Sequence, residues 1–374
     1  DTFDLVEQAL RSGGSKAGFD FLVRKFLKEK NYPLLFEVRL MKKRHELRLP
    51  LIQTESSENF PNDKRSAYEQ GSLEAAREVG SLFLEDGKIP LAWPYFRAIG
   101  ESAPVAAAIE EIEPQEGIDA IIEIAFYEQV HPRKGLELIL ANYGLCRAIT
   151  SFGQYPCSEG REQSAHLLIS NLHGEVVKNL KWAINKREGQ PPNTQSIPEL
   201  IVERDWLFEG NSTYTDSTHV ASIVQLSLER NKRETLTLAL ELTDYGKSLG
   251  PMFQFPGEPP FQNLYVDHAV YLGALLGNNT EQAILHFRNK VIESESGQAG
   301  INQVQVLVKL LTRLKRYPEA IEISLKHLRG IPRDQLSCPS IHQLCQLARE
   351  FGQLKELTRE EGDLLNFTAA TLQK

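Results

Sequence analysis

Apolar residues recur at helical spacing along almost the whole chain, and the period-two alternation typical of strands is absent. One predicted helix, residues 19–30, carries its apolar side chains on a single face: Phe19, Leu22, Val23, Phe26 and Leu27. The sequence Asn31-Tyr-Pro33 predicts a turn, and residues 34–49 predict a second helix that runs back along the first. The repeating unit is therefore a helix hairpin.

The same pattern of helix, turn and returning helix continues to the C-terminus. Glycine and asparagine mark several of the turns, as at Asp86-Gly-Lys88 and Gly277-Asn-Asn-Thr280. The predicted helices are residues 3–10, 19–30, 34–49, 65–84, 90–99, 117–129, 132–143, 158–187, 197–208, 218–229, 233–247, 264–276, 281–292, 301–314, 318–328, 340–351 and 354–372.

We expect an all-α fold in which antiparallel helix hairpins stack into an α/α superhelix or close into a ring. Each hairpin would bury the apolar face that its neighbour exposes, at ~25 cal/mol per Å² of apolar area. Residues 1–374 are predicted to form one array, because no linker is long or polar enough to force separate domains. The alternative is a subdivision into N-terminal hairpins 1–150, a long-loop core 151–296 and C-terminal hairpins 297–374.

Two phrases carry the hairpin pattern most clearly. Residues 83–99 read Phe-Leu-Glu-Asp-Gly-Lys-Ile-Pro-Leu-Ala-Trp-Pro-Tyr-Phe-Arg-Ala-Ile, and residues 310–328 contain Leu-Lys-Arg-Tyr-Pro-Glu-Ala-Ile. Both phrases, and the second more closely, resemble the turn and second helix of a tetratricopeptide repeat. In that family the small residue after the turn, here Ala320, lets the two helices approach. The irregular spacing indicates a divergent array. The resemblance implies a scaffold whose concave face binds a protein or peptide.

Composition and charge argue against several classes of protein. A formal net charge of -8 argues against a general nucleic-acid binder, and the basic stretch Met41 to Arg48 is best explained as a solvated helix face. Four cysteines in 374 residues form no disulfide framework, and no apolar run is long enough to span a membrane. We therefore expect a soluble cytoplasmic protein, although the start at Asp1 leaves a processed N-terminus open.

A candidate ligand pocket lies near the loop of residues 246–263, which is longer than a repeat turn requires. This loop either forms a lid or caps the core beneath it. The aromatic residues expected to line the pocket are Trp206, Tyr214, Phe253, Phe255, Phe261, Tyr265 and Tyr271.

Several histidines fall early in predicted helices, where equivalent positions of a stacked array would line up along one surface. The candidate metal ligands, for zinc or iron, are His173, His219 and His268. The candidate acid–base residues are His219, His268, Asp216 and Asp267. The alternative is that the histidines are buried and hydrogen-bonded and that the two aspartates are helix caps.

A second cluster, Cys338, His342 and Cys345, has zinc-ligand residue types but lacks a fourth ligand, so buried thiols are the preferred interpretation. No phosphate-binding glycine loop and no nucleophile elbow occurs. Two functions stay open. The first is a binding scaffold for a protein or peptide, and the second is a metal-dependent or His/Asp acid–base enzyme, or a small-ligand binder, with its site in residues 166–276.

Overall fold

The computed structural model describes residues 1–52, 59–293 and 300–373. Across these ranges every regular element is a helix, and the only β-type pairing is an isolated bridge between Pro256 and Asn263. The all-α prediction is confirmed. No helix in the described ranges has the length and apolar character needed to cross a membrane.

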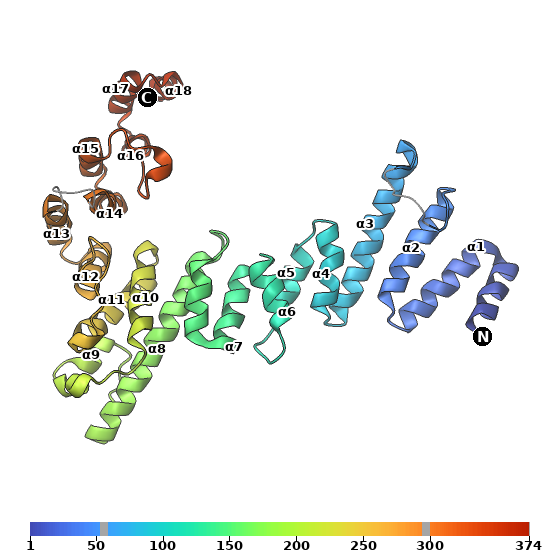
Figure 1. The fold of residues 1–374 in the computed structure, drawn as a ribbon, viewed down its shortest axis with the longest axis horizontal. Helices are drawn as coiled ribbons and strands as arrows, with labels where there is room; N and C mark the ends of the chain where they lie inside the picture. Colours follow the sequence, from blue (N-terminus) through green and yellow to red (C-terminus); the bar gives the residue numbers. More distant parts are fainter. Residues whose placement is uncertain (53–58, 294–299, 374) are drawn as a thin grey trace. The chain divides into compact units, whose positions relative to one another are not determined.

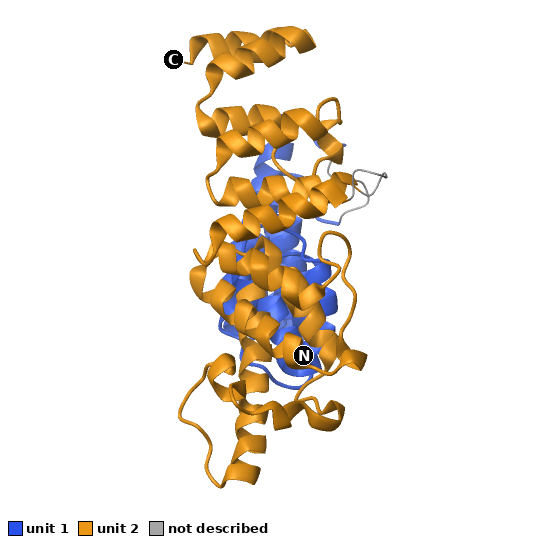
Figure 2. Cartoon of the chain, turned by 90° about the vertical axis from the view of Figure 1, so that its left-hand side faces the viewer, with its two compact units in different colours: residues 1–164 blue, residues 165–374 orange. Residues whose placement is uncertain are grey.

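The chain divides into two compact units, residues 1–164 and residues 165–374 (Figure 2). Each unit is held together by contacts between helices that follow one another in the sequence. The single array expected from the sequence stays a prediction, and its alternative boundary at residues 296–297 lies outside the described residues.

Unit 1 consists of helices that pack against the next helix along the chain, and short turns join α1 to α2 and α3 to α4 (Figure 1). Its elements are α1 (Thr2–Lys28), α2 (Tyr32–Glu46), α3 (Asn62–Glu85), α4 (Ile89–Ala98), α5 (Ala103–Glu110), α6 (Asp119–Ile122), the π-helix η2 (Glu123–Tyr127) and α7 (Pro132–Gly153).

Two sequence predictions for unit 1 can be compared with the structure. The break expected between residues 10 and 19 is present as a kink within α1, where Gly14 leaves helical geometry with φ 67°. The helix expected over residues 117–129 is a short α-helix that continues as the π-helix η2. Gly135 of α7 packs so close to this segment that a Cβ would lie 2.8 Å from the Phe126 nitrogen, an approach that only glycine allows.

Unit 2 begins within α8 (Arg161–Glu188) and carries the candidate sites. Its further elements are α9 (Ile197–Ile201), η3 (Asp205–Asn211), α10 (Ser217–Leu226), η4 (Ser227–Glu229), α11 (Arg233–Ser248), η5 (Pro251–Phe253), α12 (Leu264–Leu275), α13 (Thr280–Glu293), α14 (Gly300–Arg313), α15 (Tyr317–His327), η6 (Arg333–Gln335), α16 (Ile341–Ala348), α17 (Phe351–Glu361) and α18 (Leu364–Leu372). One continuous apolar core runs from α12 to α18.

Three predictions for unit 2 match the structure. The long helix predicted over residues 158–187 is α8, the pair predicted for residues 264–292 is α12 and α13, and the pair predicted for residues 301–328 is α14 and α15. The single helix expected over residues 354–372 is wrong. Gly362 takes φ 71° and ends α17, and the Asp363 carboxylate accepts a hydrogen bond from the Asn366 nitrogen and caps α18. The helix expected over residues 197–208 is also interrupted, by Val202 with ψ 134°.

Close packing of α11 on α12 depends on Gly246. A Cβ at this position would lie 2.3 Å from a ring atom of Tyr265, which is 2% exposed and has no room to move. Gly246→Ala is therefore expected to destabilise the protein by roughly 1–2 kcal/mol, although alanine is the better helix former. Thermal unfolding followed by circular dichroism measures the effect.

Gly174 of α8 provides the matched control, because an added Cβ there meets no atom within 4 Å. Gly174→Ala is expected to stabilise the protein by roughly 0.5–1 kcal/mol through helix propensity alone. Equal stabilisation by both substitutions contradicts the close approach of α11 and α12.

Candidate functional site

Asp216 and His219 lie at the N-terminus of α10. The Asp216 Oδ1 accepts hydrogen bonds from the Thr218 nitrogen at 2.8 Å and from the Thr218 hydroxyl at 2.7 Å, and these bonds lower the pKa of the carboxyl. The His219 Nε2 lies 4.0 Å from the Asp216 Oδ2. Asp216 is therefore a helix cap, and an acid–base role for the pair stays a prediction.

Asp267 lies one turn into α12, and only 1% of its surface is exposed. Its carboxylate accepts three hydrogen bonds, from the Asn263 nitrogen at 2.9 Å, the His286 Nε2 at 2.8 Å and the Lys290 Nζ at 3.0 Å. His286 and Lys290 come from α13 and were missed in the sequence. Their spacing of four residues, which places both on the α12-facing side of α13, was the available signal.

His268 is buried beside this cluster rather than part of an open site. Its Nδ1 lies 2.6 Å from the Leu264 carbonyl oxygen, which only accepts, so Nδ1 carries the proton. The imidazole lies against the Phe261 ring with centroids 4.3 Å apart. Burial lowers the pKa of His268 to about 4, against the opposing effects of the Leu264 carbonyl and Asp267. The ring is neutral at pH 7.

His173 on α8 is also engaged with a carboxylate. Its Nε2 donates to the Glu241 Oε2 at 2.8 Å, and the Ile197 nitrogen donates to the same oxygen at 2.9 Å. Burial of Glu241 raises the pKa of its carboxyl, but these hydrogen bonds outweigh it and hold the pKa below the ordinary value. The contact joins α8, the start of α9 and α11.

The predicted metal site is not confirmed. No group of three or more His, Cys, Asp or Glu side chains within the described part of the chain is arranged to hold a metal ion. His173, His219 and His268 each have a separate partner: Glu241, Asp216 and the Leu264 carbonyl. Each histidine thus lies against its own neighbouring helix or turn, and metal binding by the three histidines stays a prediction.

Three of the seven predicted pocket aromatics are core residues. Phe261, Tyr265 and Tyr271 are 7%, 2% and 3% exposed, and Phe261 and Tyr271 pack around Phe287. The remaining four are half-buried: Trp206, Tyr214, Phe253 and Phe255. The Tyr214 hydroxyl donates a hydrogen bond to the Leu207 carbonyl, and the Arg187 guanidinium lies over the Trp206 ring. Three of the seven side chains therefore pack in the core of unit 2, and a ligand role for the set stays a prediction.

The two thiols near His342 are buried. Cys338 and Cys345 are 7% and 0% exposed, and burial raises the pKa of each thiol to about 11. Both thiols are therefore protonated at neutral pH, which is the state of structural cysteines rather than of zinc ligands.

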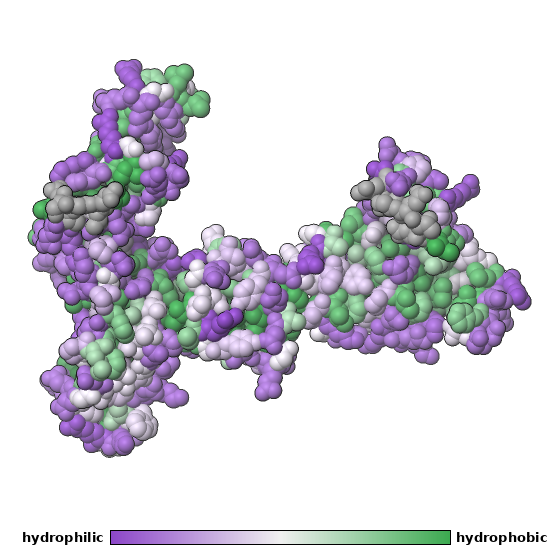
Figure 3. Space-filling model, in the orientation of Figure 1, coloured by the Kyte–Doolittle hydropathy of each residue, from purple (hydrophilic) through white to green (hydrophobic). Residues whose placement is uncertain are grey.

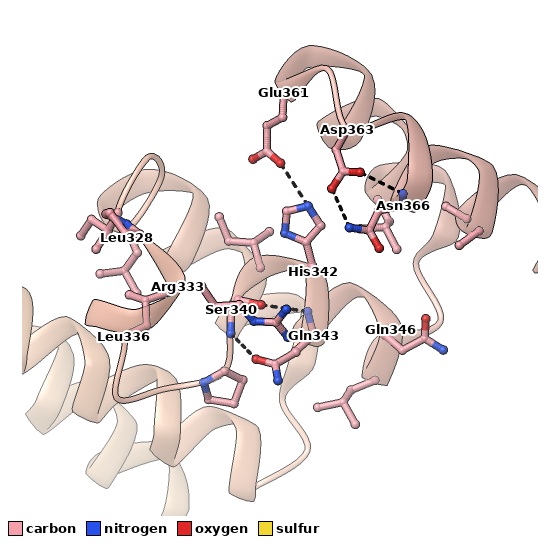
Figure 4. A pocket seen from close by; sticks show the side chains of 18 of the residues that line it. Leu328, Arg333, Leu336, Ser340, His342, Gln343, Gln346, Glu361, Asp363 and Asn366 are labelled. Carbon is pink, nitrogen blue, oxygen red and sulfur yellow. Dashed lines mark hydrogen bonds and ion pairs between the residues drawn. The ribbon is translucent and has the colours of Figure 1, made fainter.

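A groove with a volume of about 850 Å³ lies at the C-terminal hairpins of unit 2 (Figure 4). One wall is the segment that follows α15 and includes η6, the floor is α16, and the other wall is formed by α17 and α18. The apolar residues that line it include Leu328, Ile331, Leu336, Ile341, Leu354 and Ala370.

Polar side chains stand around this apolar lining. Figure 4 shows the His342 ring beneath Glu361, whose Oε2 lies 3.0 Å from the His342 Nε2. The two atoms are in contact but do not form a hydrogen bond. Ser340 and Gln343 close a capping box at the start of α16, with the Ser340 nitrogen 2.9 Å from the Gln343 Oε1. The first contact joins the floor to the wall formed by α17, and the second fixes the start of the floor helix.

The groove also carries unused amide groups. Four of its lining residues have side-chain amides: Gln343, Gln346, Asn366 and Gln373. Within the described residues, the Gln346 and Gln373 amides make no hydrogen bond, and the Asn366 Nδ2 donates to Asp363 at 2.6 Å. α18 also exposes Leu364, Leu365 and Leu372, and Figure 3 shows an apolar patch among hydrophilic residues at this end of unit 2.

Comparison of the chain with protein-family models finds no matching family, and comparisons with curated proteins and with solved structures find no similar protein either. The function therefore has to be argued from the geometry of the sites.

Proposed function

We propose that the protein is a helical-repeat scaffold and that the groove formed by α16, α17, α18 and the segment after α15 binds a peptide of a partner protein. The observation that carries the proposal is an apolar groove bordered by free side-chain amides. Its volume lies in the range of ligand-binding clefts, and an apolar lining with few polar groups is the usual composition of such clefts.

The amides favour a peptide over a purely apolar ligand. A carboxamide has both a donor and an acceptor, so it satisfies the C=O and the N–H groups of an extended backbone equally well. Leu336, Ile341 and Ala370 then offer contact to the apolar side chains of the bound segment. Burying one leucine of the peptide contributes about 1.5–3 kcal/mol.

The adjoining helices support the scaffold part of the proposal. The phrase that resembles a tetratricopeptide repeat, residues 310–328, supplies the end of α14 and the whole of α15, and these two helices pack together. Ala320 is fully buried, as expected for the small residue that lets two helices approach. The first such phrase, residues 83–99, is likewise the α3–α4 turn, with Ala92 fully buried.

A peptide-display selection on the immobilised full chain tests the proposal. Selected peptides are expected to share apolar side chains and to lose affinity for Ala369→Trp by about tenfold or more, because the indole fills the groove. Isothermal titration calorimetry measures the affinities.

Thr371→Trp is the matched control. Thr371 is an exposed residue of the same helix that does not line the groove, so the same indole is expected to leave the affinity unchanged. Selected peptides that bind the two variants equally rule out this groove, and a selection that enriches no peptide rules out peptide binding there.

A further inference from the structure

The second half of α8 carries an exposed tryptophan within a stripe of lysines. Trp182 is 64% exposed, and the Lys186 Nζ lies 5.2 Å from the centroid of its ring. Lys178 and Lys181 occupy the preceding turn on the same face of the helix. The end of α8 projects beyond the neighbouring helices, at the lower left of Figure 1.

A groove of about 430 Å³ runs along this face. Its helical side is formed by Gly174, Val177, Lys178, Lys181, Trp182 and Asn185, and Pro191 and Gln195 of the segment after α8 form the opposite side. Val177 is 3% exposed and provides an apolar base. Gly174 meets no packing atom where a Cβ would be, so the groove is open to the helix backbone at this end.

The positive charge of the groove is not neutralised within the protein. Neither Lys178 nor Lys181 makes an ion pair or hydrogen bond with any part of the chain that the structure describes. Of the nearby carboxylates on α8, Glu188 pairs with Arg204, and Glu175 accepts a hydrogen bond from the uncharged Thr215 hydroxyl at 2.5 Å. The ammonium groups of Lys178, Lys181 and Lys186 outnumber the one carboxylate, Glu175, that has no cationic partner here. A locally cationic site therefore stands on a chain whose formal net charge is -8.

The geometry points to this groove, which we name the Trp182 groove, as a docking site for an acidic peptide that carries an aromatic or aliphatic side chain. The apolar side chain would pack between Trp182 and Pro191, and its carboxylate neighbours would face Lys178 and Lys181. Tryptophan is enriched among the residues that dominate protein interfaces, and charge complementarity adds specificity and a faster encounter.

A single-stranded nucleic acid is the less suitable occupant. Such ligands use several aromatic platforms along a basic track, whereas this groove has one exposed aromatic ring on an acidic chain. The Trp182 groove is lined by none of the residues that line the C-terminal groove, so the inference stands apart from the proposed function.

Titration calorimetry of the full chain with an acetylated heptapeptide of glutamates around a central phenylalanine tests the inference. At low salt the peptide is expected to bind, and the same peptide with lysine for glutamate is not. The double variant Lys178→Glu/Lys181→Glu is expected to weaken binding of the glutamate peptide by about tenfold or more, and so is Trp182→Ala. Roughly 0.5 M salt is expected to weaken binding of the same peptide to the wild-type chain.

Lys28→Glu, an exposed lysine of α1, is the matched control and is expected to leave the affinity unchanged. Circular dichroism checks that the variants stay folded, which the exposed positions of Lys178, Trp182 and Lys28 and the half-buried position of Lys181 favour. Three outcomes each overturn the inference. The first is no binding of the glutamate peptide at millimolar concentration, and the second is equal binding of that peptide by the wild-type chain and the groove variants. The third is tighter binding of an oligothymidylate of equal charge.

Discussion

Replacing Asp267 with alanine is expected to lower the free energy of unfolding of the α12–α13 hairpin by roughly 3 kcal/mol. The carboxylate is 1% exposed and is the shared partner of the Asn263 nitrogen, His286 and Lys290. Its removal leaves the Lys290 ammonium, which is only 15% exposed, without its counter-charge. It also leaves the Asn263 nitrogen without an acceptor at the start of α12.

Amide hydrogen exchange at pH 7, followed in peptides that cover α12 and α13, measures the lost free energy of unfolding in these two helices. The double variant Asp267→Leu/Lys290→Met is the informative control. Replacing both charges by apolar groups leaves no unpaired ion, so stability is expected to recover in part. If Asp267→Ala alone leaves exchange unchanged, Asp267 does not hold the two helices together.

Acidification from pH 7 to pH 4 is expected to destabilise unit 2 by roughly 3 kcal/mol through His268 alone. Burial lowers the pKa of this imidazole from 6.5 to about 4 in the folded protein. Below pH 6.5 the unfolded chain takes up a proton that the folded chain excludes, so stability falls as the pH falls. The loss begins near pH 6.5 and is complete near pH 4.

His268→Leu separates this effect from the titration of other groups. Leucine keeps the site apolar beside Phe261 and removes the proton uptake, so the variant is expected to lose less stability over the same pH window. Chemical denaturation at a series of pH values, with the wild-type chain measured in parallel, gives the difference. Identical pH profiles for the two proteins show that His268 is not buried as a neutral ring.

The helical elements were largely predictable because they depend on local spacing. The apolar stripe of residues 264–276 becomes α12, and Ala320 lies buried where the resemblance to a tetratricopeptide repeat requires a small residue. The missed breaks depend on single residues. Gly362 and Asp363 end one helix and start the next within a pattern that alone favoured one helix over residues 354–372.

The candidate site was much less predictable. Histidine spacing suggested a shared surface, yet His173, His219 and His268 each face a separate partner. His286 was missed because its spacing from Lys290 shows that both share one face of their helix but does not show that this face meets Asp267. Which side chain of one helix meets which side chain of the next depends on packing angles and helix offsets that no local pattern contains.

The sequence by itself determined an all-α chain of helix hairpins, since the period of the apolar positions dictates which face of each segment must be buried. Only the tertiary structure decided which polar groups are enclosed and which surfaces stay open. It buried Asp267 and His268, and it left a groove beside His342 and another beside Trp182. Burial and concavity arise from several segments at once, so they appear only when the helices are packed together.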